Sequence, residues 1–324
     1  MNPLNLPRWD GTREGFYEVW YFKLNHAEGA LWLRLTLLSG QVGWKKAAEA
    51  WGIFFKPRAA GVDHVAVKRT LPLEEFSFSN DRVAVGKSFW SDGRTAGAIR
   101  SGANAIEWDL SFEPSPRSFE HVPRALRALK LNRSTVVTPN PDLRFHGVFR
   151  VNGVAYACDG APGMQGHIHG SKNADSWAWA HSNIADDGAP FVFECLTARL
   201  RMGGLALPLL SAFYLESGGQ VFALNSLRDA IAIRSSWSLD GWEFHARKNE
   251  WSFNAAISAA RAQFAGVRYE DTNGSSLFCH NSKVSSLDLE ILRGGKLERR
   301  IRCSNACAYE VVSREKESDV RFLI

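Results

Sequence analysis

The sequence lacks the cysteine patterns and the long apolar runs that mark several classes of protein. Its 324 residues include five cysteines, an odd number, and none lies in a Cys-x-x-Cys pair, so we expect neither a disulfide framework nor a zinc ribbon. The apolar run over residues 205–215 has about half of the roughly 20 residues that a membrane-spanning helix needs, and Pro208 interrupts it. These absences predict free thiols in a reducing compartment and no transmembrane segment.

Signals for export, nucleotide binding and esterase chemistry are also missing. The first ten residues contain two prolines, no apolar segment and no small-residue cleavage site, so we expect no signal peptide and a cytoplasmic location. No Gly-x-Gly-x-x-Gly or P-loop pattern follows a predicted strand, which argues against nucleotide binding. No Gly-x-Ser-x-Gly motif is present, which removes the usual sign of an esterase.

Neither sign of charge is gathered into a long run. The 39 basic and 34 acidic residues give a net charge of +5, and a nucleic-acid footprint would need clustered Lys and Arg, so we expect no nucleic-acid partner. With 45% apolar and 23% charged residues, the composition is ordinary for a soluble globular protein. The length is enough for two domains or one large one.

Short stretches rich in aromatic and β-branched residues fill the chain, separated by turn residues. Residues 16–24 and 30–38 are linked by five residues, and Asp92-Gly93 and Asn152-Gly153 are strong hairpin turns. The density of such segments predicts an all-β protein built as a sandwich or a barrel.

Few segments have helical character. Residues 44–51 are predicted to form one or two helical turns, and Pro123 opens a short amphipathic helix over residues 122–130. Residues 230–237 are predicted as a strand, and the charged tail at residues 313–319 is expected to be solvated. We therefore expect an all-β fold with one short amphipathic helix.

Residues 163–183, at the midpoint of the chain, hold three of the nine histidines and two of the twelve tryptophans. Because side chains alternate along a strand, one face of this stretch carries polar and aromatic residues and the other carries small ones. The polar-aromatic face consists of Asp175, Trp177, Trp179, His181 and Asn183. Aromatic side chains with a few polar groups are typical of a ligand pocket.

The first predicted hairpin has similar faces. Glu18, Trp20 and Phe22 share one face, while Trp32, Arg34 and Thr36 lie opposite a row of leucines on the second strand. Alternation alone leaves open whether the leucines or the polar-aromatic side face a cavity. Trp20 and Trp177 each open a strand that precedes a Leu-rich partner, which suggests two similar β units that meet around residues 160–170, with His167 and His169 in the link between them.

These landmarks resemble those of the tocopherol cyclase, carotenoid 1,2-hydratase and AttH-like superfamily, which also includes fungal Diels–Alderases. The resemblance is carried by four short motifs in order, and it extends to about residue 247. The motifs are Glu18-Val19-Trp20-Tyr21-Phe22-Lys23, Ala30-Leu31-Trp32-Leu33-Arg34-Leu35-Thr36, Gly166-His167-Ile168-His169-Gly170 and Trp177-Ala178-Trp179-Ala180-His181-Ser182-Asn183.

The resemblance implies two consecutive lipocalin-like (calycin) antiparallel β-barrels, over residues 1–165 and 166–324, with an apolar ligand in or between them. It also implies cyclisation, isomerisation or hydration of an isoprenoid, polyene or polyketide-like molecule without a metal or organic cofactor. The alternative is a non-catalytic lipid or pigment binder. Gly166 and His169 stand where the hydratase motif has an acid and a tryptophan, so the matching proton donor is missing.

Four residues are candidates for acid–base or positioning roles. Burial beside Trp20 would keep Glu18 protonated near neutral pH, as protonation of an alkene requires, whereas a solvated or ion-paired glutamate would have no such role. His167, His169 and His181 could transfer protons or hold a substrate carbonyl; the alternative is that they tie strands together.

Six further residues are expected to contact the ligand. Arg34 is expected to bind a ligand carboxylate or polarise a carbonyl if its face lines the cavity, and is otherwise an exposed edge arginine. The six are Trp20, Trp32, Arg34, Trp177, Trp179 and Asn183. His-x-His plus a third histidine also permits a zinc site, but no carboxylate or cysteine lies at ligand spacing, so we predict no metal. The sequence does not specify the ligand or the oligomeric state.

Overall fold

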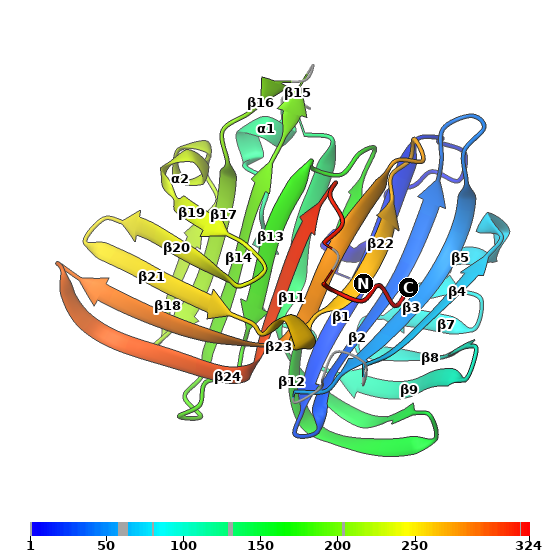
Figure 1. Ribbon diagram of the computed structural model, residues 1–324, viewed down its shortest axis with the longest axis horizontal. Helices are drawn as coiled ribbons and strands as arrows, with labels where there is room; N and C mark the ends of the chain where they lie inside the picture. Colours follow the sequence, from blue (N-terminus) through cyan, green and yellow to red (C-terminus); the bar gives the residue numbers. More distant parts are fainter. Residues whose placement is uncertain (1, 58–63, 80, 129–131, 203–204, 318) are drawn as a thin grey trace.

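The structure is a computed structural model that describes residues 2–57, 64–79, 81–128, 132–202, 205–317 and 319–324. It consists mainly of two curled antiparallel sheets that lie side by side, with the first half of the chain in one and the second half in the other (Figure 1). The predicted all-β architecture of two consecutive lipocalin-like barrels is confirmed at the level of the fold.

The first sheet is formed by residues up to Gly170. In spatial order its strands are β4 (Val65–Leu71), β3 (Lys46–Phe55), β2 (Gly29–Ser39), β1 (Phe16–His26), β12 (Val154–Gly170), β11 (Ser134–Val151), β9 (Asn104–Phe112), β8 (Arg94–Ser101), β7 (Ser88–Ser91), β6 (Arg82–Val85) and β5 (Phe76–Ser79), with β10 (Phe119–Glu120) beside β11. Short 3-10 turns, η1 (Pro3–Asn5) and η2 (Leu73–Glu75), precede β1 and β5.

The second sheet begins at Ser176. Its strands are, in order, β18 (Gln220–Leu224), β17 (Leu210–Ser217), β14 (Phe191–Arg199), β13 (Ser176–Ser182), β24 (Lys296–Ser313), β23 (Ser276–Arg293), β21 (Trp251–Ser258), β20 (Gly241–Lys248) and β19 (Arg234–Trp237), with β22 (Ala265–Glu270) beside β23. The second half of the chain also contains a small hairpin of β15 (Arg201–Met202) and β16 (Leu205–Ala206), and the 3-10 turn η3 (Arg261–Gln263).

The two sheets repeat one topology. In each, the first strand pairs with the second and with the last, and a short extra strand lies beside the penultimate one. β1 and β13 are therefore equivalent, as the similar positions of Trp20 and Trp177 in the sequence suggested. The chain passes between the sheets after Gly170, and the boundary at residues 165/166 stays a prediction.

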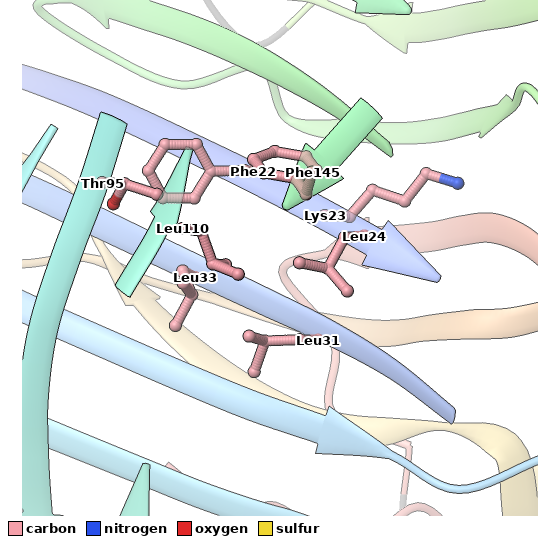
Figure 2. A pocket seen from close by; sticks show the side chains of 8 residues that line it. All are labelled: Phe22, Lys23, Leu24, Leu31, Leu33, Thr95, Leu110 and Phe145. Carbon is pink, nitrogen blue, oxygen red and sulfur yellow. The ribbon is translucent and has the colours of Figure 1, made fainter. Parts of the chain in front are cut away.

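Each sheet curls around its own apolar core, and a third layer of side chains packs between the sheets. Leu31, Leu33 and Leu35 lie in the first core, whereas Trp32 of the same strand packs between the sheets with residues of β22 and β23. Figure 2 shows Phe22, Leu33 and Leu110 converging inside the first sheet, where the enclosed cavity volume is about 0 Å³. The leucine face is thus the packed interior, and the polar-aromatic face points outward.

The predicted helical turns at residues 44–51 are wrong, because β3 covers most of this segment. Ala48, Ala50 and Phe54 pack inside the first sheet, while Trp51 and Ile53 pack between the sheets. A strand buried on both faces carries no clean alternation of polar and apolar residues. The Lys, Ala and Glu content of the segment favours a helix, but pairing with β2 and β4 overrides that preference.

The placement of His167 and His169 in a link between units is also wrong. Both lie in β12, the last strand of the first sheet, opposite Trp20 and Glu18 of β1. Glycine in this strand permits close contact: a Cβ atom on Gly166 would lie 2.3 Å from Cζ of Tyr21. Gly166 is therefore a position where another side chain covers the backbone.

Two short helices occur in the part of the chain that the structure describes, where one was predicted. α1 (Arg124–Ala128) confirms the helix after Pro123, although Leu129 and Lys130 lie outside the described residues. α2 (Leu227–Ala232) was missed, and it replaces the start of the strand predicted at residues 230–237. Its signal was present in the sequence, since Ser226 and Asp229 form a capping box.

Several smaller expectations can be compared directly with the structure. Asn152 and Gly153 have φ angles of 49° and 85° and form the tight turn between β11 and β12, as predicted. All five cysteines are free and buried. The tail at residues 313–319 is not wholly solvated, because Arg314 forms an ion pair with the buried carboxylate of Asp271. Among the described residues, no helix has the length and apolar character needed to cross a membrane.

Candidate functional site

A cavity of about 390 Å³ lies between the two sheets. Its volume is within the range of about 300–1,000 Å³ typical of small-molecule pockets. Both sheets, the α1 segment and α2 contribute to its wall. The residues most relevant to its chemistry are Tyr17, Tyr21, Trp32, Arg34, His121, Trp177, Trp179, Leu196, Tyr269, Glu310 and Arg314.

The outward faces of the first strands of each half form much of the wall. Tyr17 and Tyr21 of β1 and Trp177 and Trp179 of β13 line the cavity, whereas Trp20 of β1 points into the first core. Tyr21 and Trp179 meet edge to face, with ring centroids 5.8 Å apart. Four of the predicted ligand-contact residues, Trp32, Arg34, Trp177 and Trp179, therefore surround one space, while Trp20 lies elsewhere.

Arg34 projects from β2 into an aromatic environment. Its guanidinium carbon lies 4.1 Å from the ring centroid of Tyr269 and 5.0 Å from that of Trp51, and its Nε donates a hydrogen bond to Thr36. The rings hold the guanidinium by cation–π contact at the cavity wall. Arg34 is thus neither an edge residue nor fully exposed.

Glu194 lies behind the cavity wall in a cluster of polar groups. Its carboxylate accepts hydrogen bonds from Thr138 Oγ1 at 2.8 Å and from Trp179 Nε1 at 2.9 Å. His121 Nε2 lies 3.1 Å from Glu194 Oε1, and both side chains are fully buried. Burial alone would raise the pKa of Glu194, but the charge of His121 and the hydrogen bond from Trp179 lower it below the usual value. The carboxyl group is therefore ionised at neutral pH.

His121 and Glu194 are close but not fully satisfied. Neither His121 Nε2 nor Glu194 Oε2 has a hydrogen-bond partner of acceptable geometry, despite the short distance between the two side chains. Nδ1 of His121 faces the backbone carbonyl of Val136 at 3.3 Å and so carries a proton. A buried, incompletely satisfied histidine at a cavity wall, backed by a carboxylate, is an arrangement suited to proton transfer.

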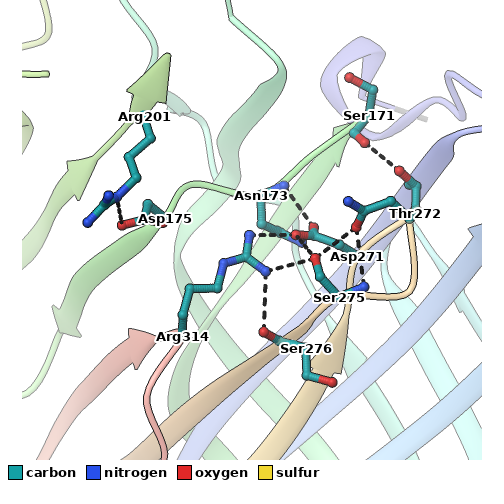
Figure 3. A network of polar contacts seen from close by, with 10 residues as sticks. Ser171, Asn173, Asp175, Arg201, Asp271, Thr272, Ser275, Ser276 and Arg314 are labelled. Atoms are coloured by element: carbon teal, nitrogen blue, oxygen red, sulfur yellow. Dashed lines mark hydrogen bonds and ion pairs between the residues drawn. The ribbon is translucent and has the colours of Figure 1, made fainter. Parts of the chain in front are cut away.

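One end of the cavity is fixed by a polar network around the segment that joins the two sheets. Asp271 accepts hydrogen bonds from the backbone and side chain of Asn173 at 3.0 and 2.7 Å, and from Arg314 at 2.6 Å (Figure 3). Asp175 pairs with Arg201 at 2.9 Å in the same view. These contacts connect the joining segment to β15 and to the turn between β22 and β23, and they connect that turn to Arg314 just after β24, which holds the wall in place.

Glu18 and His167 form a second acid–base pair, but they lie inside the first sheet. His167 Nε2 is 2.9 Å from Glu18 Oε1, and the backbone N–H groups of Arg8 and Trp9 donate to the same carboxylate at 2.8 and 3.1 Å. The chain before β1 thus covers Glu18. Neither residue contributes to the wall of the cavity between the sheets.

The same N-terminal segment occupies the other polar groups around this pair. His167 Nδ1 donates to the carbonyl of Leu4 at 2.6 Å, Trp20 Nε1 donates to the carbonyl of Asn5 at 3.0 Å, and Gln165 donates to the Asn5 side chain at 2.9 Å. Both ring nitrogens of His167 therefore face acceptors, one on the N-terminal segment and one on Glu18.

The remaining predicted site residues make structural contacts. Burial and the charge of His167 lower the pKa of His169 to about 3, so it is neutral near pH 7. His181 is fully buried and bonds through Nε2 to the carbonyl of Pro141 at 2.8 Å. Asn183 donates to Asp142 and to the carbonyl of Gly163 at 2.7 and 2.9 Å. His181 and Asn183 therefore connect the second sheet to β11 and β12.

The three histidines predicted as an alternative zinc set do not form one cluster. His167 and His169 lie inside the first sheet, with ring centroids 5.4 Å apart, while His181 bonds to Pro141. Within the described ranges, no group of three or more His, Cys, Asp or Glu side chains is placed to hold a metal ion.

The pair of His121 and Glu194 was not anticipated from the sequence. His121 precedes Pro123 in a segment considered only for its helix, and Glu194 was assigned no role. Contact between them requires the two sheets to pack together, and no local motif encodes it. The available signal was a lone carboxylate among apolar residues, Phe193 and Cys195, in a buried strand.

Comparisons with known proteins support the fold. No family model matches the chain. Two uncharacterized proteins of Mycobacterium tuberculosis, MT0513 of strain CDC 1551 / Oshkosh and Rv0493c of strain H37Rv, are each 24% identical to it over 298 residues, covering 90% of this chain and 85% of theirs.

Three solved structures share the architecture at low identity. An AttH candidate, NE1406 of Nitrosomonas europaea, superposes with a TM-score of 0.53 at 13% identity over 92% of both chains. CghA in complex with Sch210972 gives 0.56 at 12% over 93% and 89%, and kievitone hydratase of Nectria haematococca gives 0.50 at 8% over 93% and 89%. The chain therefore has the AttH-like fold, and the resemblance found in the sequence is confirmed at that level.

Proposed function

We propose that the protein is an enzyme that binds a hydrophobic small molecule in the cavity between the sheets and promotes its cyclisation, isomerisation or hydration. The observation that carries the proposal is the placement of His121, backed by the carboxylate of Glu194, in the wall of an aromatic-rich cavity. Structures with this fold include a Diels–Alderase and a hydratase, which agrees with a catalytic role.

Two groups of residues would have distinct tasks. Trp177, Trp179 and the tyrosines of β1 would hold an apolar or polyene body by stacking and burial. Nε2 of His121 lies 3.1 Å from Glu194 Oε1 and Nδ1 faces the carbonyl of Val136, so the ring would turn toward the cavity to exchange a proton with the substrate, and Glu194 would stabilise the charged form of the ring. Positioning in a water-poor cavity would supply the rest of the rate enhancement.

Glu18 and His167 remain a second candidate for proton transfer. In the observed arrangement, residues 2–9 cover the pair and satisfy its hydrogen bonds, so a substrate would reach it only after this segment moved. His121 needs no such rearrangement of the N-terminal segment. We therefore assign proton transfer to His121 and regard the Glu18–His167 pair as the anchor of the N-terminal segment.

The test begins with purification from the native host and mass spectrometry of hydrophobic molecules that are extracted with the protein. Incubation of a recovered molecule with the wild type is expected to give a changed product. His121→Phe, which keeps a ring but loses both nitrogens, is expected to lower kcat by about 10²–10⁴-fold with ligand binding retained. His245→Phe, on β20 and outside the cavity, is the matched control and should retain activity.

Three results would contradict parts of the proposal. An unchanged ligand after long incubation would identify a non-catalytic binder of lipids or pigments. Full activity of His121→Phe would show that His121 is not the proton-transfer group. Loss of activity in Glu18→Gln, with normal stability and a normal His121→Phe variant, would instead move the chemistry inside the first sheet.

A further inference from the structure

Two neighbouring side chains on the cavity face of β2 have hydrogen-bond donors that no described residue satisfies. Trp32 is 2% exposed, and its indole N–H, which can only donate, has no partner. Arg34 lies two positions further along the same face and uses only its Nε, toward Thr36. Among the described residues, no carboxylate lies within ion-pair distance of Arg34.

The other charged side chains deep in the cavity are neutralised by partners. Arg314 pairs with Asp271, and Glu310 accepts a hydrogen bond from Lys283 at 2.7 Å. Arg34 is therefore a cation held without a counter-charge by Tyr269 and Trp51 in a mostly apolar space. Leaving a charge uncompensated in such a place is costly unless a ligand supplies the opposite charge.

We propose that Trp32 and Arg34 form a binding subsite for the carboxylate of an amphipathic ligand, whose apolar body extends along Trp177 and Trp179. This inference rests on the proposed function, because it uses the same cavity, and it names the class of substrate as a hydrophobic monocarboxylic acid. Arg34 lies against Tyr269 and Trp51 whereas His121 lies against Glu194, so the acid group would be bound by residues other than the proton-transfer group and would orient the chain.

The chemistry of the two side chains favours a carboxylate. A guanidinium presents a planar fork that matches two carboxylate oxygens, and stacking on rings reduces the entropy lost on binding. The indole N–H adds one more donor to an oxygen that can accept several bonds. One guanidinium neutralises one carboxylate, whereas a phosphate monoester carries about −1.5 to −2 charges and would leave negative charge uncompensated.

Basic side chains at the cavity rim agree with an anionic ligand. Arg133 and Lys172 line the cavity near the joining segment, and neither has an ion-pair partner among the residues the structure describes. Arg201 at the same rim is paired with Asp175. The unpaired charges there are both positive, and such a rim attracts anions from solution.

The experiment compares an acid with its neutral ester on the full chain. Binding of cis-parinaric acid and of methyl cis-parinarate is measured by their fluorescence at pH 8, where the acid is ionised. Wild type is expected to bind the acid at least tenfold more tightly than the ester. In Arg34→Gln the two affinities should become equal, mainly through loss of acid binding, while Arg34→Lys should recover part of the preference.

The controls separate this subsite from the fold and from the cavity as a whole. Arg268→Gln removes an exposed arginine on β22 that pairs with Glu270, and it should leave both affinities unchanged. Trp32→Phe removes the N–H but keeps an aromatic ring, and it should weaken the acid several-fold without changing ester binding. Circular dichroism and thermal unfolding of each variant show whether the fold is retained.

Each outcome decides between the two proposals. Equal binding of acid and ester by the wild type, or an undiminished preference in Arg34→Gln, would overturn the carboxylate subsite and leave the hydrophobic cavity intact as a site. Failure of both probes to bind would count against the subsite and the proposed function together. Displacement of parinaric acid tenfold better by hexadecyl phosphate than by palmitate would also overturn the assignment, in favour of a phosphate.

Discussion

Replacing Glu18 by alanine should release the N-terminal segment and destabilise the first sheet. The carboxylate is buried and accepts from His167, Arg8 and Trp9, so the substitution removes the acceptor of three donors at once. Removing one partner of a buried, hydrogen-bonded pair costs about 3–5 kcal/mol, because the other group stays buried without compensation.

Glutamine at the same position should have a smaller effect. Its amide oxygen can still accept from one of the two backbone N–H groups, and its NH₂ can donate to His167 Nε2 when that ring is neutral. One buried donor then loses its acceptor, which costs about 1–3 kcal/mol. Glu14→Gln is the matched control, because Glu14 pairs with Lys46 near the surface and such pairs contribute about 0–1 kcal/mol.

Urea unfolding followed by tryptophan fluorescence gives the free energies, and hydrogen exchange gives the local effect. The expected order of stability is wild type close to Glu14→Gln, then Glu18→Gln, then Glu18→Ala. The amides of Arg8 and Trp9 should exchange faster in Glu18→Ala even where the sheet stays folded, because they lose their acceptor. Unchanged protection of both amides, or stability within about 1 kcal/mol of wild type, would refute the anchoring role of Glu18.

Three further substitutions test other parts of the structure. Burial, and next the charge of Lys23, lower the pKa of His181 to about 3. Between pH 6.5 and 3 the unfolded chain therefore binds a proton at His181 that the folded chain does not. The free energy of unfolding should fall over this range by up to about 4–5 kcal/mol. Urea titrations of His181→Gln should show a flatter decline in this range, and an identical decline would contradict the assignment. Burial lowers the pKa of Lys23 to about 8, so wild type is penalised below pH 8 and the penalty disappears between pH 8 and 10.5. The free energy of unfolding of Lys23→Met should therefore exceed that of wild type by up to about 3 kcal/mol at pH 7, reduced by the contribution of the lost hydrogen bond to Asn25. This difference should shrink above pH 8, and a difference independent of pH would contradict the assignment. Gly166→Ala should cost about 1–3 kcal/mol in chemical unfolding, because the new Cβ meets the ring of Tyr21, and no loss would mean that the ring moves freely.

Local turn chemistry and strand alternation predicted the all-β class, whereas the two consecutive barrels were implied by the family resemblance. Asn152-Gly153 adopts positive φ angles that few other pairs tolerate, so its hairpin could be read directly from the sequence. β3 and β12 were misjudged for the opposite reason, because long-range packing determines them. The composition of β3 favours a helix, and Gly166 and Gly163 of β12 are explained only by the Tyr21 ring and the Lys23 backbone that lie close over them.

Residues of the candidate site that share one strand could be grouped from the sequence, whereas residues brought together by the packing of the two sheets could not. Alternation placed Trp32 with Arg34, and Trp177 with Trp179, on common faces, and each pair lines the cavity. Alternation could not tell which face is covered by the other sheet, so Glu18 was grouped with these residues although it points the opposite way. His121 and Glu194 come from different halves of the chain, and their proximity exists only after the halves associate.

The repeated topology explains why the cavity lies between the halves rather than inside either of them. The interior of the first sheet is filled by its leucines and aromatic residues, and the second has its own continuous core. The outward faces of β1 and β13 are then the surfaces left to form a pocket, and they do so because their aromatic side chains meet across the interface, as Tyr21 and Trp179 do. The shape of the cavity consequently depends on how the two sheets pack. Substitutions in this interface can change the ligand accepted while both cores, and therefore the fold, remain intact.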